Sequence, residues 1–472
     1  MEKMKTINEI TNRLSRSISL KIGVTGFLIL LLLIPVVMIQ RLIEERKFTR
    51  DKVVMEVSDK WGKMQALTGP VLVLPYFEID IRNNEMYKTW RKLFVLPESL
   101  DIDGKINPEI RYRGIYKVIV YGSDLELKGE FRIPDLTKIG IIPENVDWKN
   151  ASLVFGLTDM RGIQNEIKIV WQGKNISVEP GTENKTIARS GFTAKVPVSD
   201  TGISFDFNFN INLNGSKCLY FTPVGKTTKV KLNSGWTTPS FSGSFLPDSR
   251  KISNDGFEAE WTILHLNRNY PQYWIDETYK LTGPTATPIY AQNWDQMDYS
   301  HNISNPIFGV NLLFPVDEYQ KTMRSAKYAI MFISLTFLIY LFVEILNKKR
   351  IHPVQYLLVS FGLLLFYTLL LSLSEHLGFN LAYLISALAI IGLITVYSHS
   401  IFKSITLGMV TSIALTVLYI FLFVILQLED YSLLLGSIGL FIILALIMHL
   451  SKRINWYGQL NENKEPSGTN NE

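Results

Sequence analysis

The chain has 472 residues, of which 47% are hydrophobic and only 19% are charged. Soluble domains carry about a quarter charged residues, so this composition excludes a disordered or collagen-like chain and indicates a protein with membrane-spanning segments. Lys and Arg number 48 against 43 Asp and Glu, a net charge of +5, and so small an excess excludes a nucleic-acid-binding protein. Cys218 is the single cysteine, which excludes an intrachain disulfide framework.

Six long apolar runs predict membrane-spanning helices, one near the start of the sequence and five close together at its end. A helix rises 1.5 Å per residue, so about twenty residues cross a hydrocarbon core of about 30 Å. Residues 41–327, which lie between the first run and the second, are mostly polar. The six runs are residues 22–40, 328–346, 354–373, 379–397, 405–428 and 432–450.

Lys and Arg in the short loops predict the orientation of these helices. They gather before the first run, between the second and third, between the fourth and fifth, and after the sixth. By the positive-inside rule both termini, residues 1–21 and 451–472, are cytoplasmic and the large segment is outside. Five basic residues directly after the first run would favour the opposite orientation: Arg41, Arg46, Lys47, Arg50 and Lys52. Long translocated domains cross the membrane largely regardless of charge, so we keep the expected orientation.

The outside segment is expected to begin with a helical stalk at residues 41–67. Apolar side chains recur there at spacings of three and four, the period of an amphipathic helix. Thr68-Gly69-Pro70 predicts the end of the stalk, because proline cannot continue a helix.

The clearest strand signal lies at residues 203–214, where apolar and polar residues alternate strictly. This period of two predicts a half-buried antiparallel strand. Asn214-Gly215 predicts a hairpin turn, with residues 218–221 as the return strand. Cys218 is then a small packed side chain rather than a redox group.

Strand and turn signals follow one another closely over the rest of the outside segment, which predicts antiparallel sheets in a sandwich or barrel. The expected fold class is an α+β membrane protein: six transmembrane helices, one N-terminal and five C-terminal, with a large, mainly antiparallel β domain inserted after the first helix. Further strands are expected at residues 71–74, 92–96, 114–121, 124–131, 152–157, 166–171, 192–196, 229–232 and 258–263. Turns are expected at Asp103-Gly104, Pro180-Gly181, Thr201-Gly202 and Asp255-Gly256, and an irregular connection at residues 267–306.

The sequence lacks the short motifs of a nucleotide site, a zinc protease or a serine-type nucleophile, so no catalytic residue, metal or cofactor is expected. Polar residues in the membrane part are the remaining candidates. Glu344 lies near the cytoplasmic end of the second run, where an intramembrane carboxylate is a proton-relay or ligand candidate. The alternative is a side chain at the depth of the interface that pairs with Lys348 and Lys349.

His352, Gln355 and Tyr356 open the third run on the cytoplasmic side. Pro353 belongs in the first turn of a helix, so His352 is expected to cap that helix rather than to bind a metal. Tyr356 fits the aromatic belt at the membrane interface.

Glu375 and His376 close the third run on the outside. Neighbouring residues on a helix point about 100° apart, so the two side chains do not form a catalytic dyad by themselves. The last outer loop adds two more acidic residues to this face. A docking surface for basic residues such as Arg324 or Lys327 is the economical explanation.

The chain resembles the CreD family of bacterial inner-membrane proteins from the first apolar run to about residue 457. Together with Glu344, the motifs that carry the resemblance are Leu67-Thr-Gly-Pro-Val-Leu-Val-Leu-Pro75, Leu96-Pro-Glu-Ser-Leu100, Asp159-Met-Arg-Gly-Ile163, Pro239-Ser-Phe-Ser-Gly-Ser-Phe-Leu-Pro247, Asp317-Glu-Tyr-Gln320, His352-Pro-Val-Gln-Tyr-Leu-Leu-Val359, Ser372-Leu-Ser-Glu-His376 and Leu433-Leu-Leu-Gly436. The resemblance implies a multi-pass protein of the inner membrane, expressed with the Cre two-component regulon. It further implies a part in envelope integrity, tolerance to E-group colicins and, in some bacteria, the β-lactam response.

Three functional hypotheses follow, and the first is a non-enzymatic sensor or scaffold that acts through a periplasmic β domain. Its coupling to the helices would pass through the stalk and through Asp317, Arg324 and Lys327. The second is a transporter or channel-like module for an envelope component, and the third is an envelope enzyme at Glu375 and His376. The second would use polar residues inside the bundle: Glu344, Tyr356, Tyr367, Glu375 and His376. The partners expected are the lipid bilayer and other envelope proteins, with no nucleic acid and with no small-molecule ligand specified.

Overall fold

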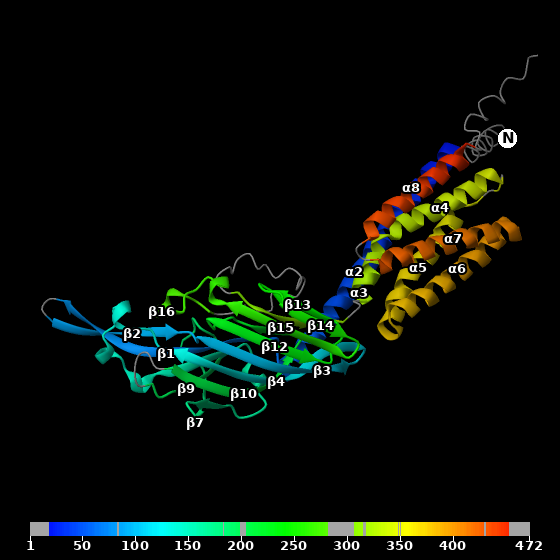
Figure 1. The fold of residues 1–472 in the computed structure, drawn as a ribbon. Helices are drawn as coiled ribbons and strands as arrows, with labels where there is room; N and C mark the ends of the chain where they lie inside the picture. Colours follow the sequence, from blue (N-terminus) through cyan, green and yellow to red (C-terminus); the bar gives the residue numbers. More distant parts are fainter. Residues whose placement is uncertain are drawn as a thin grey trace, which may run out of the picture. The chain divides into compact units, whose positions relative to one another are not determined.

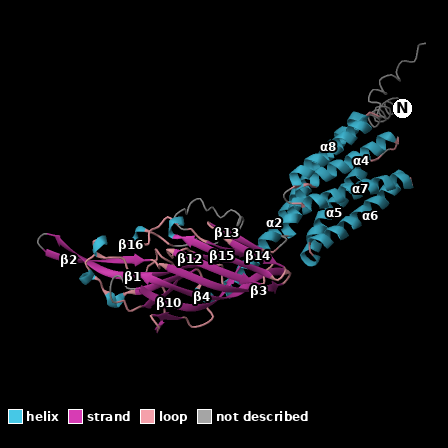
Figure 2. Cartoon of the chain, in the orientation of Figure 1, coloured by secondary structure: helices cyan, strands magenta, loops and turns pink. Residues whose placement is uncertain are grey.

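The computed structural model divides into two compact units, a helical unit formed by Met1–Thr49 with Val316–Glu472, and a β unit formed by Arg50–Pro315 (Figure 1). Helices make up the first unit and strands dominate the second (Figure 2). The residues that the structure describes are 18–82, 85–182, 184–198, 204–281, 306–314, 318–347, 349, 351–428 and 431–452.

Within the described residues, six helices are long and apolar enough to cross a membrane. They confirm the predicted arrangement of one N-terminal and five C-terminal spans: α2 (Ile18–Trp61), α4 (Ala329–Leu346), α5 (Pro353–Leu377), α6 (Phe379–Phe402), α7 (Ile405–Gln427) and α8 (Ser432–Ser451). A short amphipathic helix, α3 (Glu318–Lys327), precedes α4 and was not predicted as a separate element. The residues of α3 are mostly polar, so the sequence has no apolar run there that would predict a helix.

The first helix is longer than a membrane span and ends earlier than predicted. α2 runs without interruption for 44 residues and stops at Trp61, so the stalk does not extend to residue 67. Gly62 follows the last helical residue with φ +157°, outside the helical region, and a Cβ there would lie 2.5 Å from the carbonyl oxygen of Asn214, so only glycine fits. The residues that were expected to end the helix, Thr68-Gly69-Pro70, lie inside strand β1.

The β unit contains two sheets that share one apolar core. The first sheet has the order β13 (Pro239–Gly243), β17 (Phe308–Leu312), β11 (Cys218–Phe221), β1 (Gln65–Arg82), β5 (Ser152–Leu157), β9 (Gly191–Lys195), β8 (Glu179–Pro180). In addition, β2 (Glu85–Val95) pairs with β1, and β16 (Tyr273–Ile275) pairs with β2. The second has the order β14 (Ser249–Ser253), β15 (Gly256–Leu264), β12 (Thr227–Ser234), β3 (Ser99–Arg113), β4 (Tyr116–Arg132), β10 (Ser204–Ser216), β6 (Lys168–Trp171), β7 (Lys174–Ser177). Most pairs are antiparallel, and β1–β11 and β3–β12 are parallel.

Aromatic side chains join the two sheets. Phe209 of the second sheet contacts Phe155 of the first at 5.5 Å between ring centroids, in an edge-to-face arrangement. Within the second sheet, Phe131 packs on Phe207 at 5.2 Å and on Trp171 at 6.0 Å and extends this aromatic cluster. The predicted alternation is confirmed over residues 204–214, because every apolar side chain of β10 turns into this core, and Ile203 lies outside the described residues.

Two predicted turns are wrong. β10 continues through Asn214-Gly215 to pair with β4, and β11 lies in the other sheet, next to β1 and β17. Gly215 is needed for a close approach rather than for a turn: a Cβ there would lie 2.3 Å from the hydroxyl oxygen of Tyr121, which donates to the carbonyl of Cys218 at 2.7 Å. The predicted turn at Asp103-Gly104 lies in the middle of β3, paired with β4 and β12.

The other expectations for the β unit have mixed outcomes. Residues 152–157 and 218–221 are strands with the predicted bounds, and Asp255-Gly256 ends the turn between β14 and β15. The segment 267–306 is not wholly irregular, because it contributes β16; residues 282–305, like Thr201-Gly202, lie outside the described residues.

Cys218 is buried as predicted. Burial raises the pKa of its thiol to about 12, against a smaller opposing effect of Lys217. A thiol held protonated in this way is a packed side chain and a poor nucleophile.

We expect Gly129→Ala to destabilise the β unit, because a Cβ at this position would lie 2.1 Å from the carbonyl oxygen of Ser99 and 2.7 Å from the ring of Phe207. Forcing a methyl group into a packed core costs about 1–3 kcal/mol. Thermal unfolding of the purified chain, followed by tryptophan fluorescence, measures the loss. Gly122→Ala on the same strand is the matched control, since its Cβ would meet only a side-chain oxygen at 3.5 Å; equal effects of the two changes would contradict the packing.

Candidate functional site

Among the described residues of the helical unit, Glu344 is the most deeply buried charge, with a side chain that is 3% exposed. One carboxylate oxygen accepts from Lys21 Nζ at 2.7 Å and from the backbone N–H of Ile351 at 3.3 Å. The other accepts from the hydroxyl of Tyr356 at 2.9 Å. We call Lys21, Glu344, Ile351 and Tyr356 the Glu344 cluster. Both carboxylate oxygens of Glu344 have a hydrogen-bond donor in it.

The Glu344 cluster joins three helices that are far apart in the sequence. Lys21 comes from the first turns of α2, Glu344 from the last turn of α4 and Tyr356 from the first turn of α5. The sequence predicted Lys348 and Lys349 as partners of the Glu344 carboxylate. Lys348 lies outside the described residues. The backbone N–H of Lys349 donates to the backbone carbonyl of Glu344, not to its carboxylate. The ion pair therefore fastens α2 to the bundle, because breaking it would leave a charge in an apolar environment.

His352 caps α5, as predicted. Its Nδ1 accepts from the backbone N–H of Val354 at 3.3 Å, while the side chain of Gln355 accepts from the N–H of His352 at 2.9 Å. The two residues form a reciprocal capping box at the start of a helix whose first residue is Pro353. These contacts account for His352 and Gln355 without a ligand.

At the opposite end of α5, Glu375 accepts a hydrogen bond from the hydroxyl of Tyr319 in α3 at 2.9 Å. The neighbouring side chain, His376, is exposed. Lys321, also in α3, is 9% exposed and donates to Gln427 of α7 at 3.0 Å. α3 thus docks on the ends of α5 and α7 through polar contacts, the kind of surface that the sequence indicated, although Tyr319 and not a basic residue is the donor to Glu375.

Of the three predicted coupling residues, Asp317 lies outside the described residues. Arg324 and Lys327 both belong to α3. Lys327 is exposed and makes no ion pair within the described part of the chain. The structure therefore brings Glu344 and Tyr356 together and places Glu375 and His376 at the other end of the same helix.

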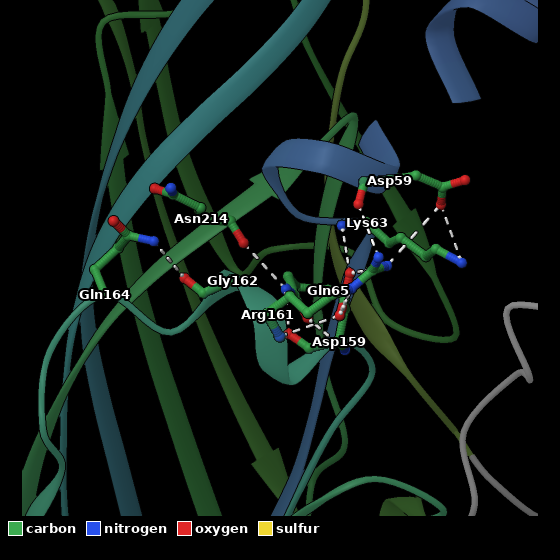
Figure 3. A network of polar contacts seen from close by, with 8 residues as sticks. All are labelled: Asp59, Lys63, Gln65, Asp159, Arg161, Gly162, Gln164 and Asn214. Carbon is green, nitrogen blue, oxygen red and sulfur yellow. Dashed lines mark hydrogen bonds and ion pairs between the residues drawn. The ribbon is translucent and has the colours of Figure 1, made fainter. Parts of the chain in front are cut away.

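A second polar cluster lies in the β unit, at the segment between the end of α2 and the start of β1 (Figure 3). Asp159 is buried and accepts from the backbone N–H groups of Lys63 and Arg161, each at 3.1 Å. The guanidinium of Arg161 forms two further bonds with this carboxylate at 3.0 Å and donates to the carbonyl oxygen of Asp59 at 2.8 Å. A cation is favourable at this carbonyl because it belongs to the last turn of α2.

Gln65, at the first position of β1, completes this cluster. Its side chain is almost fully buried. The amide nitrogen donates to the carbonyl oxygens of Asp159 and Asn214 at 3.0 Å, and the amide oxygen accepts from the N–H of Asp159 at 3.1 Å (Figure 3). We call Asp59, Lys63, Gln65, Asp159, Arg161 and Asn214 the junction network, and it links the end of α2 to strands of both sheets.

Apolar contacts support the same junction. Val54 of α2 packs on Val118 and Val120 of β4, with Val57 and Trp61 beside them. The indole N–H of Trp61 donates to the carbonyl of Tyr121 at 3.1 Å. The last turns of α2 are therefore fixed to the β unit on two sides, by the junction network and by this apolar seam.

The junction network was missed as a site by sequence reasoning. Residues 159–163 stood out only as part of the family resemblance, and their chemistry depends on Lys63 and Gln65, which are more than ninety positions away along the chain. Burial opposes ionisation of Asp159, but the Arg161 side chain and the N–H groups of Lys63 and Arg161 outweigh it, so the pKa of Asp159 is lowered.

Neither cluster suggests a metal or cofactor site. Within the described part of the chain, no three His, Cys, Asp or Glu side chains lie close enough together to hold a metal ion. The polar groups of both clusters are satisfied by one another, an arrangement that fixes helices in place.

Comparisons with known proteins point to one family. The family model described as "Inner membrane protein CreD" matches residues 17–457. Inner membrane protein CreD of Escherichia coli (strain K12) is 33% identical over 438 residues, which cover 91% of each chain.

Among solved structures, an M1 zinc metallopeptidase from Deinococcus radiodurans aligns over 36% of this chain and 39% of its own, with a TM-score of 0.19 and 11% identity. Yeast LTA4 hydrolase in complex with bestatin aligns over 61% of this chain and 51% of its own, with a TM-score of 0.18 and 10% identity. Scores this low carry no argument about fold or function.

For the Glu344 cluster we predict strong coupling between Lys21→Met and Glu344→Gln. Removing the lysine leaves a buried carboxylate without its counter-charge, so this single change should cost about 2 kcal/mol or more. Removing both charges restores balance, and the double variant should lose clearly less stability than the sum of the two single variants. Thermal unfolding of the four chains in one detergent gives the cycle; simple additivity would show that the pair does not fasten α2.

For the junction network we predict that Asp159→Asn lowers the unfolding free energy at pH 7 by about 2 kcal/mol, because charge-assisted hydrogen bonds are lost. The pKa of Asp159 is lowered in the folded chain, so its contribution is present above the unfolded pKa near 3.9 and disappears as the pH falls through the folded pKa. The gap between wild type and variant should therefore be constant near neutral pH and narrow as the pH falls below about 4, toward the lowered folded pKa of Asp159. A gap that stays constant over this range would contradict the assignment.

Proposed function

The chain belongs to the CreD family of inner membrane proteins, and we propose that it is a non-enzymatic envelope protein in which α2 couples the β unit to the helical unit. In this proposal the β unit senses or binds an envelope component. The helical unit holds the protein in the bilayer and receives the signal. No reaction is assigned to either unit.

The proposal includes an orientation, with both termini in the cytoplasm and the β unit in the periplasm. The distribution of Lys and Arg among the short loops supports it. Roles in colicin tolerance and in the β-lactam response are proposed on the resemblance to the family alone.

One observation carries the proposal: α2 is fastened by buried polar groups at each of its ends. Near its start Lys21 pairs with Glu344 inside the helical unit, and at its end the backbone N–H of Lys63 binds Asp159 inside the β unit. Between these points the helix is continuous from Lys21 to Trp61, 41 residues, which corresponds to about 60 Å. A continuous helix with both ends fixed is suited to transmit a displacement from one end to the other.

The enzyme hypothesis has less support. The side chains of Glu375 and His376 have different surroundings: Glu375 accepts a hydrogen bond from Tyr319, whereas His376 is exposed. A transporter remains the second candidate, because buried hydroxyls line the bundle: Tyr340 with Ser398, Tyr383 with the carbonyl of Tyr419, and Tyr367. The hydrogen bonds of Tyr340 and Tyr383 join different helices, which also suits a purely structural role.

The coupling predicts that Val57→Pro abolishes the envelope phenotype while the protein still inserts in the membrane. Proline inside a helix costs about 3 kcal/mol and bends it, and Val57 packs on the seam between α2 and β4. Val57→Ala is the matched control, since it keeps the helix. Detergent and colicin sensitivity of cells that carry equal amounts of each variant is the measurement. Full function of the proline variant at normal abundance would overturn the proposal.

The scaffold and the transporter predict different results for the double variant Lys21→Met with Glu344→Gln. A scaffold needs α2 to stay in place, so the charge-balanced variant should retain most of the envelope phenotype. A transporter that moves protons through Glu344 should lose function entirely at equal abundance. The same strain comparison, with immunoblotting of membranes, distinguishes them.

A further inference from the structure

β1 and β2 extend beyond the rest of their sheet as a two-stranded ribbon (Figure 1). β5 follows β1 only as far as Val73, and β16 follows β2 only from Leu93 to Val95. From Glu85 to Arg91, the outer edge of β2 has no strand beside it within the described part of the chain. A free edge of this kind is a template for another strand.

The ribbon also exposes large side chains that a soluble surface seldom shows. Met86 is 77% exposed and Trp90 is 59% exposed, while Tyr87 is 48% exposed. A two-stranded ribbon is only marginally stable by itself, so an additional strand along its edge would be favourable.

The backbone of β2 shows which residues offer hydrogen bonds outward. The N–H of Lys92 donates to the side chain of Asp276 and the N–H of Leu96 to the carbonyl of Gln272, both on the side away from β1. Because strand residues alternate, Met86, Lys88 and Trp90 also present their N–H and C=O groups outward.

We propose that β2 pairs antiparallel with β2 of a second copy of this chain, with Thr89 on the two-fold axis. In this register Lys88 faces Trp90 of the second copy and Tyr87 faces Arg91 of the second copy. Each contact occurs twice, and each joins a cation to an aromatic ring. Lys88 and Trp90 are the outward residues that the two new pairs of backbone hydrogen bonds require.

Neighbouring registers are less favourable. A two-fold axis on Lys88 places two ammonium groups opposite each other, and like charges directly opposed are destabilising. An axis on Tyr87 pairs Glu85 with Thr89 and Met86 with Lys88, without a cation facing a ring. The cation–aromatic contacts and the absence of opposed like charges therefore favour a second copy aligned on Thr89.

Disulfide crosslinking of the full chain in native membranes tests this inference. Two Thr89→Cys residues would form a non-hydrogen-bonded pair with Cα atoms about 4.5 Å apart, within the range of a disulfide. Two Met86→Cys residues would be about 20 Å apart, because six residues of strand separate their positions. The native Cys218 is buried and need not be removed.

We expect Thr89→Cys to form a covalent dimer at least about tenfold more than Met86→Cys, although Met86 is far more exposed. Lys251→Cys on β14, an exposed edge strand of the other sheet, is the control for random collision. Crosslinking that peaks at position 87 or 88 would overturn the register. Equal crosslinking at 86 and 89, or none above the Lys251→Cys control in protein of normal abundance, would overturn the pairing itself and would favour a different occupant, such as a lipid surface.

Discussion

The junction between helix and sheets depends on one buried carboxylate. Asp159 accepts hydrogen bonds from the first residues after α2 and from the turn after β5, and its guanidinium partner, Arg161, also satisfies a carbonyl in the last helical turn. Without this carboxyl group, the N–H of Lys63 would lose its acceptor in a partly buried site. The end of a long helix is thereby joined to both sheets through contacts that must form together.

The Glu344 cluster also stabilises a buried carboxylate, here in an apolar environment. A carboxylate that is 3% exposed within a helical membrane unit is costly unless its oxygens are paired. Lys21, Tyr356 and the N–H of Ile351 provide that pairing, and Lys21 belongs to the same helix that ends in the junction network. Both buried charges therefore act on α2, and this is the basis for regarding α2 as the coupling element.

Local patterns in the sequence were enough to predict much of the fold. The six apolar runs correspond to the six long helices, and the alternation at residues 203–214 identified β10, because both signals depend on side-chain periods of a few residues. The His352 cap followed from its place before Pro353. Partners of buried charges could not be predicted in this way: Glu344 is adjacent in sequence to lysines, yet it pairs with Lys21, and Asp159 pairs across more than ninety residues. The hairpin at Asn214-Gly215 failed for a tertiary reason, since the ring of Tyr121 occupies the space above Gly215.

The central claim is that α2 transmits between its two fastened ends, and a double-mutant cycle between Lys21→Met and Arg161→Ala tests it most directly. Changes at sites far apart normally add within about 0.3–0.5 kcal/mol. If α2 couples the ends, the unfolding free energy of the double variant in lipid nanodiscs will depart from additivity by more than this amount, and the envelope phenotype will follow. Strict additivity in both measurements would show that the two ends act independently and would contradict the account.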